Sequence, residues 1–436
     1  AVSFTVLVFT FGLDRSYVRE FHNTSDKASL LKNTLIPPLA ILLGISIILL
    51  IIAPTYISGL LFGEEDSTLS IFVTATLISA LLTRFFSLTL RMNERGIAFS
   101  LSQLLPKCIL LLVVIYYIAS GTSKNLTALI LAQTIAYVSV CIIFSWNTRN
   151  EWLSSLRSRM DLHKFRSLLK FGFPLVFGGL AYWGLTASDK IFLRVFSDYE
   201  ELALYSVAVR FAAAATILQS VFSTVWIPTV YQWEKEGKNL ENIDLVMRYV
   251  LLCVIIIFCV AGLLSWILNY IIPSQYAEVQ FLIIACLSYP LLYTLSETTV
   301  VGINISRNTF FALLASMLAL ALNLLGNWLL IPEYGASGAA ISSSIAFFAF
   351  FIFRTEFSSY LWRKIPRKTA YIYTFLVTAG AIFTNSLTVD AHNIPILFWS
   401  LILASTFYIF KKEYTETFRF ILKNVQQLIS SPKNFV

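Results

Sequence analysis

Charged residues are scarce in this sequence, and their scarcity excludes an ordinary soluble protein. Asp, Glu, Lys and Arg make up 13% of the 436 residues, whereas hydrophobic residues make up 57%. A soluble domain carries about 25% charged residues. Apolar segments of about 20 residues recur along the chain, and each can cross a hydrocarbon core about 30 Å thick. Because these runs are continuous rather than alternating, the sequence predicts an all-α, polytopic membrane protein and not a β-barrel.

Residues that commonly carry catalysis are also few. The 3 histidines lie far apart, and the sequence contains neither an H-E-x-x-H metal motif nor a G-x-x-x-x-G-K-[ST] phosphate loop. The 5 cysteines all fall within apolar segments, where Cys behaves as a small hydrophobe. We therefore expect no metal, no cofactor, no disulfide and no enzyme activity.

The apolar segments divide into thirteen predicted transmembrane helices. Their approximate bounds are 1–21, 30–53, 68–91, 97–119, 126–146, 171–196, 199–231, 245–272, 277–302, 308–331, 335–360, 370–388 and 393–410.

Lys and Arg are distributed very unevenly between the loops. Counting the loops alternately, nearly all of them fall in one set, which includes the basic segment 147–170. The opposite set is acidic, as in the loop around Glu64, Glu65 and Asp66. The positive-inside rule places the basic set in the cytoplasm. The net charge of +8 then reports topology and contact with anionic lipid headgroups, so we expect no nucleic-acid partner.

A weak internal repeat organises the helices. A shift of 212 positions lays RMNERGIAFSLSQLL on INISRNTFFALLASM, and the flanking loop lengths agree. Two six-helix lobes in tandem form a parallel repeat. On this register the first lobe lacks its first helix, so we expect one helix before Ala1 and fourteen in total. The predicted segments are an N-terminal lobe (1–146), an interfacial cytoplasmic linker (147–170), a C-terminal lobe (171–360), two additional transmembrane helices (361–410) and a cytoplasmic amphipathic tail (411–436).

Several ionisable residues lie at membrane depth, where charge is costly and usually faces a bundle interior or a water-filled cavity. Each one alone could be a paired structural ion. As a set they leave an excess of positive charge, which suits an anionic substrate and above all a phosphate group. The deep cations are Arg84, Lys107, Lys190 and Arg210, and the deep carboxylates are Asp189, Glu297 and Asp14. Arg354 and Glu356 lie close enough to the cytoplasm to snorkel, so we interpret them as structural.

The stretch LTASDKIFLRVF places two opposite charges side by side. Neighbouring residues on a helix point about 100° apart, so Asp189 and Lys190 must face different directions. We expect Lys190 to line a cavity while Asp189 orients Arg210 on the next helix. Two alternatives stay open: Asp189 couples an ion to transport, or it pairs with Arg15.

Three segments together resemble the polysaccharide-exporter family. They are FGFPLVFGGLAYWGLTASDKIFL, LALYSVAVRFAAA and IPEYGASGAAISSSIAF, and they are similar to the FGLP, SDR, GLYSVAYK and YGAxGAA signatures of Wzx-type O-antigen flippases. FGLDRSYVREF likewise looks like the second helix of that family. The resemblance implies the multidrug/oligosaccharidyl-lipid/polysaccharide exporter fold, with two six-helix lobes around a cationic cavity. Asp189 and Lys190 match the family's acidic–basic pair, and Arg210 matches the basic residue that closes GLYSVAYK.

The resemblance also implies a function. The expected substrate is an undecaprenyl-pyrophosphate-linked oligosaccharide, moved across the bacterial inner membrane by alternating access. Membrane lipids, a polysaccharide polymerase and a chain-length regulator are the expected partners. Asp189, Glu297 and Asp14 are the deep carboxylates available for proton or sodium coupling. Fourteen helices look more like the lipid II flippase and some capsule or teichuronic-acid exporters, which leaves the glycan class open.

Three other functions fit the sequence less well. A multidrug exporter of the same superfamily would favour an anionic cavity for cationic drugs, whereas here cations are in excess. A polysaccharide polymerase or ligase would need catalytic groups on large outer loops, and the longest outer loop spans only about 54–68. A purely scaffolding protein would have no reason to keep charges at depth.

Overall fold

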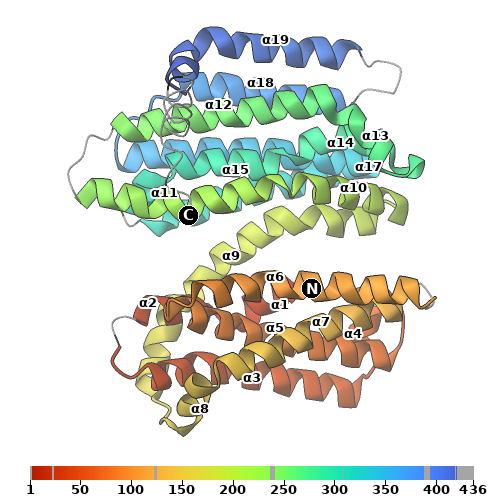
Figure 1. Ribbon diagram of the computed structural model, residues 1–436, viewed down its shortest axis with the longest axis vertical. Coiled ribbons are helices and arrows are strands. Elements are labelled where there is room, and N and C mark those ends of the chain that lie inside the picture. Colours follow the sequence, from red (N-terminus) through yellow and green to blue (C-terminus); the bar gives the residue numbers. More distant parts are fainter. Residues whose placement is uncertain are drawn as a thin grey trace, which may run out of the picture. The chain divides into compact units, whose positions relative to one another are not determined.

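A computed structural model describes residues 2–21, 24–121, 125–235, 241–306, 308–386, 393–417 and 419. The described residues form helices and connecting turns, with no strand among them (Figure 1). The chain divides into two compact units, Ala1–Leu180 and Ala181–Val436, and the boundary falls inside one long helix, α9 (Leu162–Phe196). The five-segment division of the chain stays a prediction.

Unit 1 contains eight further helices besides the first half of α9. They are α1 (Val2–Phe9), α2 (Leu13–Glu20), α3 (Lys27–Ile52), α4 (Tyr56–Phe62), α5 (Ser67–Met92), α6 (Gly96–Ala119), α7 (Leu126–Asn147) and α8 (Arg149–Arg157). Short polar side chains begin several of them by accepting a hydrogen bond from a free first-turn amide. Asp26 accepts from Ser29 N, Asp66 from Thr68 N and Asn125 from Ala128 N.

Unit 2 contains the second half of α9 and the remaining helices. They are α10 (Tyr199–Ala212), α11 (Ala215–Lys235), α12 (Glu241–Leu264), α13 (Leu268–Ile271), α14 (Val279–Cys286), α15 (Ser288–Thr299), α16 (Val301–Ile305), α17 (Thr309–Leu361), α18 (Lys368–Asn385) and α19 (Asn393–Ile409), with two short 3-10 turns at Ser265–Ile267 and Ser274–Tyr276. At the centre of the unit, α15 packs against α11, α12 and α17 (Figure 1).

Each of the thirteen predicted segments coincides with helix, but the helices are divided differently. The predicted span 1–21 consists of two helices, α1 and α2, because the chain breaks at Gly12, whose φ of 71° favours glycine. The segments 308–331 and 335–360 join as α17 across a kink at Gly335, where φ is 51°. By length and composition, eight described helices can cross a membrane, or ten if each of two bent pairs is one span. The number of crossings therefore stays a prediction.

The last predicted segment, the tail over 411–436, lies mostly outside the described residues. Its described part begins with a helix, Lys411–Thr417, which bends 78° away from α19. The buried carboxylate of Glu413 pairs with Arg248, and Glu416 accepts a hydrogen bond of 2.8 Å from Tyr249. The helix Lys411–Thr417 is therefore docked on α12.

The outer surfaces of the helices are apolar. Large hydrophobic side chains are exposed along α3 and α6, and Ile51 and Ile52 on α3 are more than three-quarters exposed. Water would penalise such a surface, whereas lipid tails match it. The chain is a multi-pass membrane protein.

Two glycines allow α9 to cross the start of α2. A Cβ atom added at either Gly12 or Gly172 would collide with backbone atoms of the other residue. Beside this crossing, Ser16 Oγ donates to the Leu168 carbonyl at 2.8 Å, and the Leu168 side chain is buried with Leu13 and other residues of α2 and α3. The first half of α9 is therefore part of the core of unit 1.

Candidate functional site

Unit 1 contains a cavity of about 480 Å³ that holds most of its membrane-depth charge. Three cations, Arg15, Arg84 and Lys107, line it together with one carboxylate, Asp14. The charged residues come from α2, α5 and α6. The neutral polar groups of the lining are Ser3, Thr10, Thr83, Ser87, Ser102, Gln103 and Tyr137. The lining is cationic overall and rich in hydroxyl groups.

Asp14 holds Arg84 in place within this cavity. The Nη2 and Nε atoms of Arg84 lie 2.7 and 3.2 Å from Asp14 Oδ2. The Arg84 side chain remains 44% exposed, so the rest of its guanidinium fork is free to meet a ligand. Arg15 donates to the Leu175 carbonyl at 3.0 Å. Lys107 is exposed and has no ion-pair partner among the described residues.

In unit 2, Asp189 is enclosed by neutral hydrogen-bond donors. Its side chain lies in a residue only 2% exposed. Oδ1 accepts from the amides of Asn323 at 3.0 Å and Asn327 at 2.8 Å. Oδ2 accepts from Ser343 Oγ at 2.6 Å and from the Tyr205 hydroxyl. The four donors come from α10 and from both halves of α17.

The predicted pairing of Asp189 with Arg210 is wrong. The structure has no ion pair between these two described residues, because four neutral donors already fill the accessible sides of the carboxylate. Lys190 and Arg210 are both exposed. Asp189 thus lies in a buried polar cluster, whereas its neighbour Lys190 is exposed.

Glu297 does not belong to this cluster, and it forms an ion pair with Arg354. Its Oε1 lies 2.8 Å from Nη1 of Arg354, and the two side chains are only 6% and 12% exposed. Arg354 also donates to Ser296 Oγ at 2.7 Å and lies over the rings of Tyr293 and Phe350. The interpretation of Arg354 as a snorkelling side chain is therefore wrong. Its depth along the helix is small, but the packing of α15 against α17 encloses it.

Sequence reasoning missed the partners of Asp189. Asn323 and Asn327 are one helical turn apart in an otherwise apolar run, and that spacing places two amides on one face. Asn327 Oδ1 is buried and has no hydrogen-bond donor among the described residues. The cluster therefore presents one carboxylate and an unsatisfied amide oxygen within a neutral shell. The described residues contain no group of three or more His, Cys, Asp or Glu side chains placed to hold a metal ion.

Two helical units with apolar exteriors and polar, charged interiors define a helical multi-pass membrane protein. The fold is similar to that of a structure titled lipid II flippase MurJ, inward closed conformation, with a TM-score of 0.66 and 16% identity over 94% of this chain and 90% of that one. It is also similar to the Vibrio cholerae MATE transporter VcmN in the bent form, with a TM-score of 0.55 and 15% identity over 83% and 86% of the two chains. At such identities the likeness concerns the fold alone.

The family model of polysaccharide biosynthesis proteins matches residues 1–234, and the chain belongs to that family. Among curated proteins, it is 24% identical over 248 residues to the capsular polysaccharide biosynthesis protein CapF of Staphylococcus aureus. That match covers 55% of this chain and 62% of the relative's length. The recognised family and the predicted helical exporter fold are confirmed.

Proposed function

We propose that this protein is a flippase that moves an undecaprenyl-pyrophosphate-linked oligosaccharide across the bacterial inner membrane. The cavity of unit 1 carries the proposal: three cations and one carboxylate line about 480 Å³ at membrane depth in a polysaccharide biosynthesis family member. Charge of this kind is expensive in a membrane protein unless a ligand or water uses it. A pyrophosphate bridge supplies the opposite charge, and a sugar supplies partners for the hydroxyl groups of the lining.

The residues of this cavity have different roles in the proposed binding. Asp14 occupies one edge of the Arg84 guanidinium, so the remaining N–H groups are oriented before a ligand arrives. Lys107 adds a point charge on a flexible stem, which follows a phosphate as it moves. Arg15 is hydrogen-bonded to the α9 backbone and adds a third positive charge to the cavity lining. Lys190 and Arg210, both exposed, are the cations of unit 2 that we propose to contact the substrate.

Asp189 is the proposed coupling residue. A buried carboxylate without a cationic partner gains stability when it takes up a proton or a monovalent cation. The neutral shell can serve either event, because the hydroxyl and amide groups can turn an oxygen toward a bound cation. Glu297 and Asp14 are less suited to ion coupling, since each already forms an ion pair with an arginine.

Complementation tests the proposed substrate. In a bacterial strain whose own copy of the gene is deleted, the wild-type gene should restore surface glycan and clear the lipid-linked precursor from the inner leaflet. Arg84→Ala and Lys107→Gln should leave precursor accumulated while the protein stays abundant. Arg157→Ala is the matched control, because Arg157 is exposed and does not line the cavity. Normal glycan and normal precursor in the deletion strain would contradict the proposal.

The multidrug exporter is the alternative that shares this fold, and the same strains separate the two. An exporter of cationic drugs would change drug tolerance and leave the precursor pool unchanged. The excess of cations over carboxylates in the cavity favours the anionic substrate. A flippase would pass its product to a polymerase and a chain-length regulator on the outer face, and we include these partners in the proposal.

A further inference from the structure

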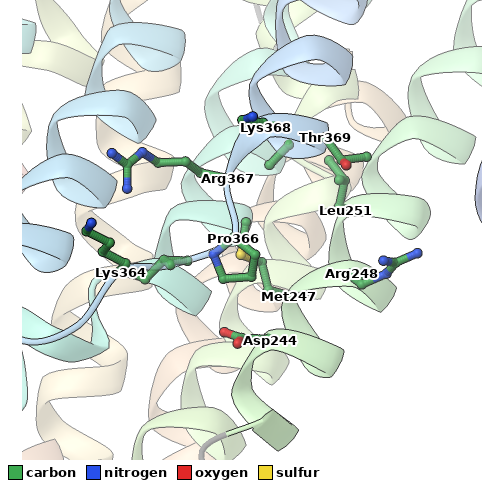
Figure 2. Close-up of a pocket in the computed structure, with 11 residues that line it drawn as sticks. Asp244, Met247, Arg248, Leu251, Lys364, Pro366, Arg367, Lys368 and Thr369 are labelled. Atoms are coloured by element: carbon green, nitrogen blue, oxygen red, sulfur yellow. The ribbon is translucent and has the colours of Figure 1, made fainter.

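A second cavity lies in unit 2, remote in sequence from the residues assigned above. It measures about 610 Å³ and lies between α12 and the segment 364–370, which joins α17 to α18. From α12 it is lined by Asp244, Met247, Arg248 and Leu251, whose spacing places them on one helix face. Figure 2 shows Lys364 and Arg367 extending to one side of Pro366 and Arg248 to the other. Cationic groups therefore flank the cavity from both sides.

Most charges around this cavity are already paired, and the remainder is positive. The lining carboxylate, Asp244, is held by both terminal nitrogens of Arg363 at 3.0 and 2.7 Å. Arg248 pairs with Glu413, and Arg367 lies 2.7 Å from Glu356. Two lining cations remain.

These two cations are Lys364 and Lys368. Both are exposed and have no ion-pair partner among the described residues. The acidic neighbours of this cavity are already paired with arginines, so an anion that enters it meets Lys364 and Lys368 without competition from those carboxylates.

The start of α18 adds hydrogen-bond donors to the same cavity. The helix begins at Lys368 with no side-chain cap and no acidic residue in its first turn. Lys368, Thr369 and Ala370 of that turn all line the cavity. The first amides of a helix lack internal partners and, with the helix dipole, favour a bound anion such as phosphate. Met247, Leu251 and Ile365 supply apolar surface beside these donors.

We propose that this cavity is a binding site for a phosphate-bearing anion, either the headgroup of an anionic phospholipid or a free phosphate compound. It lies where α12 and α18 begin, at the end of unit 2 that the positive-inside rule assigns to the cytoplasm. Basic pockets between helices at that level suit phospholipid headgroups. The proposal goes beyond the proposed flippase function and does not depend on it, because the site uses none of the residues of the unit 1 cavity or of the Asp189 cluster.

Lipid retention tests the headgroup source. The full chain is reconstituted in nanodiscs of phosphatidylglycerol and phosphatidylcholine, and bound phosphatidylglycerol is counted by native mass spectrometry. Lys364→Gln with Lys368→Gln should weaken retention about tenfold, since each basic residue near a lipid surface contributes a several-fold increase in affinity. Thr369→Trp should act in the same direction by filling the cavity without changing charge. Lys411→Gln with Lys412→Gln is the matched control, because both lysines are exposed near the end of α19 and outside the lining.

A second arm tests free phosphate. In pure phosphatidylcholine nanodiscs, inorganic phosphate should slow acylation of Lys364 and Lys368 by an amine reagent more than that of Lys411 and Lys412. Selective loss of phosphatidylglycerol in the cavity variants identifies the headgroup as the ligand, and selective protection by phosphate alone identifies a soluble one. If neither occurs, or if the control pair loses as much lipid as the cavity pair, the site does not exist.

Discussion

The two units stabilise a buried aspartate in different ways, by an ion pair in unit 1 and by neutral hydrogen-bond donors in unit 2. In unit 1, Asp14 meets the charge of Arg84 at the edge of a cavity, and the arginine remains 44% exposed. In unit 2, Asp189 meets four neutral donors in a closed cluster and has no cationic partner among the described residues. A carboxylate that is already neutralised positions its partner for another ligand. A carboxylate that is only hydrogen-bonded keeps its charge available for an ion.

Glu297 sharpens this comparison because it lies in the same unit as Asp189 and yet resembles Asp14 in being charge-paired. The difference from Asp14 is burial, since both Glu297 and Arg354 are nearly excluded from solvent. A buried pair contributes little net stability, but removing one partner leaves a charge with no compensation. The role of each carboxylate can therefore be tested by substituting it or its partner and measuring stability and export.

The largest effect is expected at the buried pair. Arg354→Met should destabilise the protein by about 3–5 kcal/mol, because it strands the Glu297 carboxylate in an apolar site. Glu297→Met combined with Arg354→Met should restore most of this loss. Thermal unfolding in detergent and membrane abundance measure both. Equal stability of the single and the double variant would show that the pair is not enclosed as described.

Substitution of Asp189 should have a small effect on stability and a large effect on export, unlike the loss of Arg354. Asp189→Asn should cost about 1 kcal/mol of stability, because the hydroxyls of Tyr205 and Ser343 can rotate to face the new amide. Export should nevertheless be abolished. Sodium should shift the unfolding midpoint of the wild type more than that of Asp189→Asn. Normal export by Asp189→Asn would contradict the coupling role.

The relation between Asp189 and Arg210 has a direct test. A double-mutant cycle with Asp189→Asn and Arg210→Gln should give a coupling energy below about 0.5 kcal/mol, since the two side chains share no ion pair. Membrane abundance and the unfolding midpoint are the measurements. A coupling energy several times larger would support the ion pair between Asp189 and Arg210 that was predicted from the sequence.

Breaking the pair between buried Asp14 and half-exposed Arg84 in unit 1 should have a modest effect on stability. Asp14→Asn should cost no more than about 1 kcal/mol, since the pair lies at the edge of a cavity and Arg84 is solvated. Export should fall because Arg84 loses its fixed orientation. Arg84→Lys should retain more export than Arg84→Ala and less than the wild type, since an ammonium replaces part of a two-pronged donor. Identical export by both substitutions would remove Arg84 from the substrate site.

The smallest expected effect concerns the start of α9. Asp161 accepts hydrogen bonds from the backbone of Lys164 and His163, which lower the pKa of its carboxyl group. A lowered pKa contributes stability above the unfolded value, about 3.9, that is lost as the pH falls through the folded value. The protection factors of the Leu162–Phe165 amides, which are exchange rates corrected for the intrinsic rate at each pH, should therefore fall below about pH 4 in the wild type. Asp161→Asn keeps the cap without the charge, and its protection factors should show no such fall.

The sequence predicted the helices well and their side-chain partners poorly. Apolar runs and capping residues such as Asp26 and Asp66 determine structure only a few residues away in sequence. The starts of α3 and α5 can therefore be located from the sequence alone. The partners of Asp189 are different, because Asn323 lies 134 positions away and reaches it through packing of α9 against α17. Arg354 was misjudged for the same reason. Depth along a helix can be counted from its end, whereas enclosure by α15 depends on tertiary structure.

The glycine crossing between α2 and α9 has a consequence for how the chain is made. The face of α2 that carries Leu13 and Ser16 is completed by Leu168, and the crossing itself needs Gly172. A nascent chain that ends at residue 147, the end of α7, has all the earlier helices of unit 1 but not the element that closes its core. In such a chain the α2 face that carries Leu13 and Ser16 remains uncovered until the beginning of α9 has been synthesised. Unit 1 is thus finished by residues that the chain produces on its way into unit 2.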